Sequence, residues 1–352
     1  MSPAHCVRII SRLRAWLRPA TLLLLCGLLS ACSGRADADV VLYVALDQNF
    51  SEPIVREFER RTGLVVRASY DVEANKSVGL RRRLQEEAER PVCDVFWNNE
   101  TAQTVLLADQ GLLESYVSPA AAEIPAAYKD PAGFWTGFAV RGRVLIVNSE
   151  RFPDAATQPA GWEAFLDPAH AERAGMARPL TGTTATHIGW FIARDGLQPT
   201  LDLLERLRGN GVHFGPGNAH LMRLVRTGEL DFGWTDTDDC QVAIDAGFPV
   251  RQVIPDQHEG GDGLMVIPNT VSVVKGGPNP ENARLLVDFL LSRQVEELLA
   301  AAPSAQIPVR SDVPRPPHVI DLSRWRIAEV DWQAAGRAYA QHADVLEAFF
   351  VR

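Results

Sequence analysis

The sequence predicts an α/β protein built from two domains. Short segments typical of buried strands alternate with amphipathic segments typical of helices, and this order implies mixed, mainly parallel sheets. The alternation restarts after Trp135. The roughly 320 residues that follow an N-terminal leader also exceed what one hydrophobic core usually covers. A second α/β unit is therefore expected.

In the first unit we expect strands at 40–44, 64–68 and 94–97, and helices starting at Ser51 and covering 75–90 and 101–109. Ser51-Glu52-Pro53 is typical of a helix start, because serine is a good cap and proline suits the first turn. Gly63 marks the end of that helix. Ligands of such sheets bind beyond the carboxyl ends of the strands, where we expect Asp47 and the turn at 98–100.

The second unit opens with a strongly apolar strand at 143–148. Helices are expected at about 184–195, 199–209 and 218–227, and a strand at 264–274. Asn279-Pro280-Glu281 is typical of another helix start. Five prolines between 303 and 317 indicate an extended connection, and the pattern predicts a final amphipathic helix near 332–350.

The leader indicates export and lipidation. Four arginines without any acid precede an apolar run from Ala20 to Leu29, which is too short to span a bilayer. Leu29-Ser30-Ala31-Cys32 then has the spacing of a lipoprotein cleavage site. We therefore expect 1–31 to be a signal peptide, Cys32 to be the lipidated first residue and 32–39 to be a tether. The lipid would hold the protein to the membrane from outside the cytoplasm.

Net charge and cysteine content limit which binding partners, disulfides and metal sites are expected. Loss of the four leader arginines changes the formal charge from −9 to −13, which disfavours nucleic acid and anionic lipid. Only Cys93 and Cys240 remain besides Cys32 in the mature chain. A disulfide is permitted in an oxidising compartment, but the sequence does not show whether the two meet. The absence of a CxxC or Cys/His cluster disfavours a thiolate zinc site.

The order of several segments resembles a known family. A signal sequence, VVLYVALDQ, DVFWNNE followed by ADQGLL, FWTGFAVRGRVLIVN and LVDFLLSRQVEELL together resemble the periplasmic substrate-binding proteins of ABC importers, in the branch of the ferric-iron-binding proteins (extracellular solute-binding family 1). The resemblance covers roughly residues 40–310 and implies a type II fold. In that fold two lobes close like a clam around a two-strand hinge. Lobe 1 is then expected at 40–138 and 263–310, lobe 2 at 139–262, and a C-terminal tie and helix at 311–352.

The resemblance also implies positions for the ligand groups. The family's metal-binding histidine falls on Asp47, its glutamate on Asn99 or Glu100, its tyrosine pair on Asp238 and Asp239, and a nearby asparagine on Asp236. The groups that hold its synergistic anion fall on Arg141, Thr181, Gly182, Thr183 and Asn218. We expect the first set, with Glu100 chosen over Asn99, to bind a cation and the second set to bind an anion. The histidine and the tyrosine pair of the family have therefore been replaced by aspartates.

Several ligands fit this altered set. Carboxylates gathered in one cleft raise one another's pKa unless a cation neutralises them, so the cluster predicts a positively charged ligand. Hard cations prefer such oxygens. Ferric iron with an exogenous anion is the first candidate, and Mn²⁺ or Ca²⁺ are others. An organic ammonium, such as a polyamine or an amino-phosphonate whose anionic end meets Arg141, is the alternative.

Structural roles remain open for the same residues. The acids at 236–239 could simply cap a helix, Asp47 could be a turn residue, and Glu100 could belong to a first helical turn. The spacing after Asp236 does not match an EF-hand loop, because Gln241 and Gly247 stand where Gly and Glu are needed. Thr181-Gly182-Thr183-Thr184 could bind an anion or only cap a helix. On the strand, we expect Arg141 to face the cleft and Arg143 to face solvent.

Enzymatic function is disfavoured by the motifs. The sequence has no GxSxG elbow, P-loop or HExxH motif. A metal-dependent hydrolase built on the aspartates is the remaining enzymatic alternative, but no histidine adjoins the cluster. We therefore expect a monomeric binding protein, not an enzyme, that captures a small ligand by hinge closure. Its expected partners are an ABC permease and its ATPase.

Overall fold

The computed structural model describes residues 38–71 and 78–351. The predicted signal peptide and Cys32 lie outside these residues. Residues Asp39–Arg352 form one compact unit. No helix in the described ranges combines the length and apolar character needed to cross a membrane.

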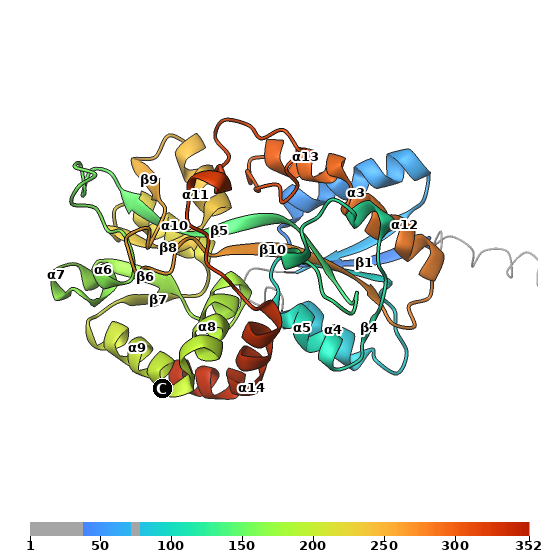
Figure 1. The fold of residues 1–352 in the computed structure, drawn as a ribbon, viewed down its shortest axis with the longest axis horizontal. Coiled ribbons are helices and arrows are strands. Elements are labelled where there is room, and N and C mark those ends of the chain that lie inside the picture. Colours follow the sequence, from blue (N-terminus) through green and yellow to red (C-terminus); the bar gives the residue numbers. More distant parts are fainter. Residues whose placement is uncertain (1–37, 72–77, 352) are drawn as a thin grey trace, which may run out of the picture. The chain divides into compact units, whose positions relative to one another are not determined.

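The unit is built on one mixed sheet with the strand order β2-β1-β3-β10-β5-β8-β6-β7 (Figure 1). β4 pairs with β10 at one side of this path, and β9 pairs with β5. The strands are β1 Val40–Val44, β2 Val66–Tyr70, β3 Val95–Asn98, β4 Leu113–Glu114, β5 Thr136–Asn148, β6 Ala174–Ala177, β7 His213–Gly215, β8 Phe232–Asp236, β9 Val250–Val253 and β10 Val266–Val274. We call β1–β4 the first half of the sheet and β6–β9 the second half.

β5 joins the two halves. Its residues 136–142 pair antiparallel with β10, and residues 143–147 pair antiparallel with β8. The ladder to β10 is irregular between Pro268 and Asn269, opposite Ala139, which has a φ of 42°. The carboxylate of buried Glu296 accepts the Ala139 N–H at 2.9 Å and so supports this unusual backbone.

Helices cover both faces of the sheet. Beside the first half, α3, α12 and α13 lie above the strands in Figure 1 and α4 and α5 below them. Beside the second half, α10 and α11 lie above and α8 and α9 below. The helices are α3 Gln48–Thr62, α4 Val78–Glu86, α5 Ala102–Asp109, α6 Glu163–Leu166, α7 Pro168–Ala171, α8 Gly182–Asp195, α9 Leu197–Gly209, α10 Asn218–Arg226, α11 Thr237–Asp245, α12 Pro280–Leu290, α13 Arg293–Ala301 and α14 Trp332–Val351. Short 3₁₀ turns lie at Pro119–Ala121, Ala126–Tyr128 and Leu322–Arg324.

Most predicted elements are present, with shifted ends. The strand at 40–44 and the helices near 101–109, 199–209, 218–227 and 332–350 match closely. The prediction that α3 starts at Ser51 is wrong, because the helix begins at Gln48 and Ser51 lies inside it. The Ser51 hydroxyl donates to the Leu46 and Asp47 carbonyls instead of capping the helix. The strand predicted at 64–68 is displaced to Val66–Tyr70, because Leu64 and Val65 connect it to the left-handed C-cap of α3, Gly63.

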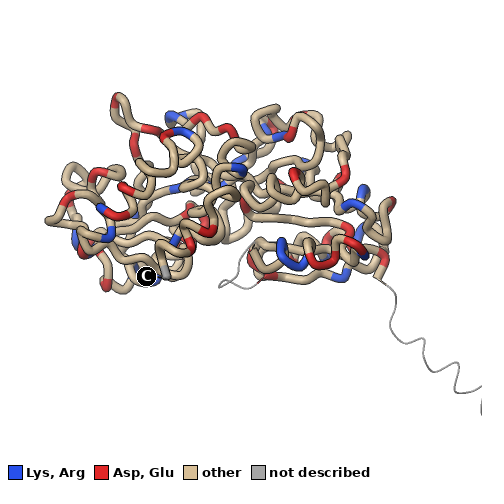
Figure 2. The backbone as a smooth tube through the Cα atoms, turned by 90° about the horizontal axis from the view of Figure 1, so that it is seen from below, with Lys and Arg blue, Asp and Glu red and all other residues tan. Residues whose placement is uncertain are grey.

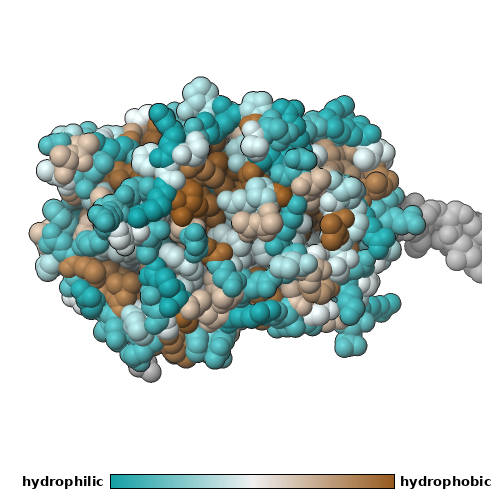
Figure 3. All heavy atoms as spheres, viewed as in Figure 1, coloured by the Kyte–Doolittle hydropathy of each residue, from teal (hydrophilic) through white to brown (hydrophobic). Residues whose placement is uncertain are grey.

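Charges of both signs are mixed along the described chain, and its two cysteines are buried. Figure 2 shows basic residues interspersed with acidic ones along the described backbone. Figure 3 shows mainly hydrophilic and neutral atoms on the face it draws, with hydrophobic atoms in a recess near its centre. Cys93 and Cys240 are both buried free thiols, so the disulfide that the compartment would permit is not formed.

Candidate functional site

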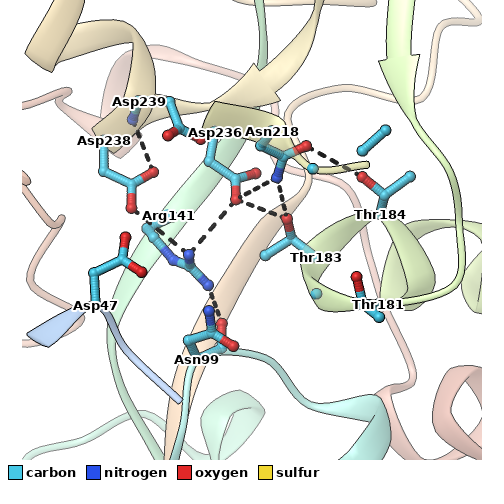
Figure 4. Close-up of a pocket in the computed structure, with 13 residues that line it drawn as sticks. Asp47, Asn99, Arg141, Thr181, Thr183, Thr184, Asn218, Asp236, Asp238 and Asp239 are labelled. Atoms are coloured by element: carbon cyan, nitrogen blue, oxygen red, sulfur yellow. Dashed lines mark hydrogen bonds and ion pairs between the residues drawn. The ribbon is translucent and has the colours of Figure 1, made fainter. Parts of the chain in front are cut away.

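A polar pocket lies where strand ends and helix starts converge (Figure 4). β1 leads to Asp47, β3 to Asn99 and β8 to Asp236, while Arg141 comes from β5. The space left between these side chains is small, about 30 Å³ for the centre of a water-sized sphere. The lining residues are Asp47, Asn99, Arg141, Ala177, Thr181, Gly182, Thr183, Thr184, Gly217, Asn218, Asp236, Asp238 and Asp239.

One side of the pocket consists of helix N-termini. Thr181 is the N-cap of α8, but its side chain makes no capping hydrogen bond, and Gly182 has a φ of 61° that favours glycine. Gly217, the N-cap of α10, has no side chain to cap with. The first-turn N–H groups of a helix have no partner within the helix, and the helix dipole is positive there. This side therefore suits an anion.

Asp236 organises the centre of the site. Arg143 Nη1 donates to its Oδ1 at 2.6 Å, and Thr183 Oγ1 and Asn218 Nδ2 donate to its Oδ2 at 2.7 and 3.0 Å. Burial alone would raise the pKa of Asp236, but the charges of Arg143 and Arg141 outweigh burial and hold that pKa below its ordinary value. The carboxylate is thus ionised and well supplied with donors.

These contacts change the expected role of Asp236. It is the N-cap residue of α11, yet its side chain makes no capping hydrogen bond. Its oxygens accept from β5, α8 and α10 instead. A plain capping role for Asp236 is therefore wrong, because most of the acceptor capacity of its carboxylate is used by these groups.

Arg143 was expected to face solvent, and this prediction is wrong. Its side chain is 1% exposed and reaches Thr183 Oγ1 at 3.2 Å and Thr184 Oγ1 at 3.1 Å as well as Asp236. Side chains two residues apart on a strand point to the same face, so Arg141 and Arg143 must share one side of β5. This two-residue repeat of side-chain direction could have predicted from the sequence that Arg143 lies on the same face as Arg141.

Arg141 lies among the acids of the pocket. Its Nη1 is 3.6 Å from an oxygen of Asp236 and 3.6 Å from one of Asp238, and its Nη2 donates to the Asn99 carbonyl. Burial opposes its charge, but Asp238, Asp236 and the other acids raise the pKa of Arg141 above its ordinary value. In this arrangement a fixed guanidinium separates Asp47 and Asp238 from the threonines of α8 (Figure 4).

Three aspartates form the acidic side together with Asp47. One oxygen from each of Asp236, Asp238 and Asp239 lies within 4.8 Å of the others. Asp239 accepts from Thr235 Oγ1 at 3.0 Å, and the Asp239 N–H donates to Asp238 Oδ1 at 3.1 Å. Counting Arg141 and Arg143 against the four aspartates, the site carries a formal charge of −2.

Glu100 does not line the pocket. Its carboxylate accepts the N–H groups of Ala102 at 2.6 Å and Gln103 at 3.1 Å at the start of α5, and the Thr186 hydroxyl at 2.6 Å. Burial raises its pKa above the ordinary value. Glu100 lies two residues before α5 and not in its first turn, but its carboxylate accepts from that turn, and the neighbouring Asn99 borders the pocket in its place.

The structure thus gathers nine of the ten residues expected to bind the cation or the anion. They are Asp47, Arg141, Thr181, Gly182, Thr183, Asn218, Asp236, Asp238 and Asp239. Gly217 had no role in the sequence-based prediction, and Thr184 was included only as part of the Thr-Gly-Thr-Thr segment. A glycine immediately before a helix has little meaning until the helices are seen to converge.

Residues 103–324 match the family described as bacterial extracellular solute-binding protein. This range includes most of the pocket residues, with Asp47 and Asn99 outside it.

Two curated relatives cover most of the chain. "Iron uptake protein A1" of Synechocystis is 22% identical over 91% of this chain and 92% of its own length. A "putative 2-aminoethylphosphonate-binding periplasmic protein" of Salmonella typhi is 26% identical over 73% of each chain. The two printed ligands, iron and an amino-phosphonate, differ in chemistry.

Solved structures share the fold. Iron-bound HitA of Pseudomonas aeruginosa has a TM-score of 0.77 at 23% identity, covering 88% of this chain and 98% of its own. AfuA of Actinobacillus pleuropneumoniae, with fructose-6-phosphate bound, has a TM-score of 0.76 at 22% identity, covering 89% and 99%. The type II periplasmic-binding fold expected from the sequence is confirmed.

Proposed function

The chain belongs to the bacterial extracellular solute-binding protein family, and on that basis we propose that it captures a small charged solute outside the cytoplasm and delivers it to an ABC importer. The partners are a permease, which receives the solute, and its ATPase. The protein is a monomeric lipoprotein anchored through Cys32 and performs no covalent chemistry. Capture proceeds by closure of two lobes about β5 and β10.

The division of charge across the pocket supports a ligand with two poles. Asp47, Asp238 and Asp239 present negative charge, whereas the N-terminus of α8 and the guanidinium of Arg141 favour an oxyanion. A ligand that carries a cationic centre at one end and an oxyanion at the other satisfies both sides at once. The excess negative charge of the site adds to the attraction for the cationic end.

An amino-phosphonate meets these demands best. The position of Arg141 supports an organic ligand over a metal ion. Its guanidinium lies beside Asp236 and Asp238, in the space between two of the three clustered carboxylates that a shared metal ion would need. Asp236 already accepts from Arg143, Thr183 and Asn218. An ammonium needs only hydrogen-bond acceptors, which Asp238, Asp239 and Asp47 supply, while the phosphonate accepts from the N–H groups of α8.

Ferric iron or another hard cation with a bound anion is the second candidate. The supporting observation is the spacing of 4.8 Å or less between the aspartate oxygens. Oxygens bound to one Ca²⁺ ion lie at about 2.3–2.6 Å from it, so two of them are at most about 5 Å apart. Metal binding at this position requires Arg141 to move away from Asp238.

A thermal-shift screen followed by calorimetry separates the candidates. Metal-stripped protein is mixed with 2-aminoethylphosphonate, phosphate, ethanolamine or ferric citrate. A ligand that binds only the folded state raises the melting temperature by mass action. We expect the amino-phosphonate to bind with a chelator present and its two half-molecules to bind much more weakly. Binding of ferric iron alone, abolished by the chelator, supports the metal instead, and the absence of any binding contradicts both.

A further inference from the structure

The C-terminal helix α14 contacts elements from both halves of the sheet. Figure 1 draws α14 with α8 on one side and α5 on the other, and both helices pack against it. α5 follows β3 of the first half, and α8 follows β6 of the second half. The N-terminal ends of α5 and α8 are also the ends that adjoin the ligand pocket. α14 therefore ties together two helices from opposite sides of the site.

The contacts with the first half are specific. Arg337 makes two hydrogen bonds to the Asp109 carboxylate of α5, at 2.7 and 2.8 Å. Trp332 Nε1 donates to the Ala127 carbonyl at 3.1 Å. A Cβ added at Gly336 would lie only 2.7 Å from Cβ of Val105, which is 2% exposed. The glycine thus allows α14 to approach α5 closely.

A second glycine allows the same approach on the other side. A Cβ at Gly189 of α8 would lie 2.6 Å from the carbonyl oxygen of Ala335. Tyr339 of α14 donates from its hydroxyl to the Leu180 carbonyl at 2.8 Å, directly before the Thr181 cap. Ala335 is fully buried and Tyr339 nearly so. The junction is therefore packed like a core on both sides.

We propose that α14 is a latch that holds the two halves in the arrangement in which the pocket is formed. The latch sets ligand affinity from outside the pocket, because opening must break the contacts of α14 with α5 or with α8. This inference rests on the proposed capture of a solute by lobe closure. A ligand that requires the closed form binds more weakly when that form is less populated.

Gly336→Ala tests the latch, because the added methyl group forces α14 away from Val105. The matched control is Gly209→Ala at the end of α9, where an added Cβ meets nothing within 4 Å. We expect Gly336→Ala to weaken binding of 2-aminoethylphosphonate, or of ferric citrate if the screen selects it, by about tenfold, mainly through faster release. Gly209→Ala should stay within about twofold of the parent. Folding is checked by circular dichroism.

A measurement without ligand separates failure of the latch from failure of the proposed function. X-ray scattering of ligand-free Gly336→Ala should give a larger radius of gyration than the parent and Gly209→Ala, even if no probe binds the parent. Unchanged scattering together with unchanged affinity overturns the latch. If Gly336→Ala does not fold, the double variant Trp332→Phe/Arg337→Gln is used. It removes the indole donor to Ala127 and the guanidinium that pairs with Asp109. Unchanged scattering and unchanged affinity of this variant also overturn the latch.

Discussion

Arg143 and Asp236 form an ion pair of 2.6 Å that is almost entirely enclosed by protein. The pair lies behind the threonines of α8 and fixes them, since Arg143 donates to Thr183 and Thr184 while Thr183 donates to Asp236. The hydroxyl of Thr184 donates in turn to Asn218 at 3.3 Å. The threonine protons are thus directed into the protein, and the backbone N–H groups of α8 remain the natural donors to an anion.

Asp236→Asn should destabilise the fold strongly. The change leaves Arg143 buried without its counter-charge, and losing one partner of a buried pair costs about 3–5 kcal/mol. Asp47→Asn is the control, because Asp47 lies at the pocket and is not part of this pair. Urea unfolding of the two variants measures the difference, and equal free energies of unfolding would refute the structural role.

The Arg143–Asp236 pair also predicts that the fold loses stability at acid pH. The pKa of Asp236 is lower in the folded state than in the unfolded state, where it is about 3.8. The ionised carboxylate therefore contributes fully to the free energy of unfolding above about pH 3.8, and this contribution is lost as the pH falls through the folded-state pKa. The parent should therefore lose more stability than Asp236→Asn on acidification below about pH 4.

Replacing both Asp238 and Asp239 with Asn tests the cationic side. Asn retains size and capping ability but removes two charges, so ligand affinity should fall by orders of magnitude while the fold stays nearly intact. Calorimetry with the ligand identified in the screen measures the loss. Unchanged affinity would mean that the acids only begin α11. If iron is the ligand, its complex should lack the visible charge-transfer colour of tyrosinate, because no tyrosine is among the described residues that line the pocket.

Asp256→Asn should make the protein more stable at neutral pH. Burial raises the pKa of Asp256 to about 7, and the nearby charges of Glu163 and Asp262 add to this effect. Between about pH 4 and 7 the folded state keeps a proton that the unfolded state loses, so stability falls as the pH rises. Asn avoids that loss. The variant should melt higher than the parent at pH 8 and alike at pH 4, and a parallel pH dependence of the two would contradict this.

Cys32→Ala tests the anchor. If Cys32 carries the lipid as proposed, the variant should incorporate no labelled fatty acid and should appear in the soluble fraction of the cell envelope. Cys93→Ala is the control, since that buried thiol is far along the chain and should not affect lipidation. Fatty-acid labelling of Cys32→Ala would exclude the lipoprotein proposal.

The sequence was most informative where local patterns decide the structure. The apolar strand at 40–44 and the helices near 199–209 and 218–227 follow from period and capping alone, and they were placed closely. The start of α3 was misplaced because Ser51-Glu52-Pro53 looks like a cap, although the chain turns into the helix directly after Asp47. Tertiary contacts outweighed the local signal there.

The sequence predicted which residues make up the site, but not which of them bind a ligand and which support the structure. Asp236, Asp238 and Asp239 are equivalent in the sequence, and only the approach of β5, α8 and α10 gives Asp236 a structural task. Asn99 and Glu100 are neighbours, and the direction of one backbone turn decides which borders the pocket. Such distinctions depend on contacts between residues distant in the chain.

Strand β5 belongs to the ligand site and joins the two halves of the sheet. Both the site and the sheet therefore depend on the register in which β5 pairs with its neighbours. Arg141 lies in the stretch paired with β10 and Arg143 in the stretch paired with β8. A slip of one residue would turn both arginines to the opposite face of the sheet, and Asp236 would lose its ion pair with Arg143. An insertion or deletion within β5 therefore cannot be absorbed by one half alone. The strand couples the evolution of the binding chemistry to that of the whole sheet.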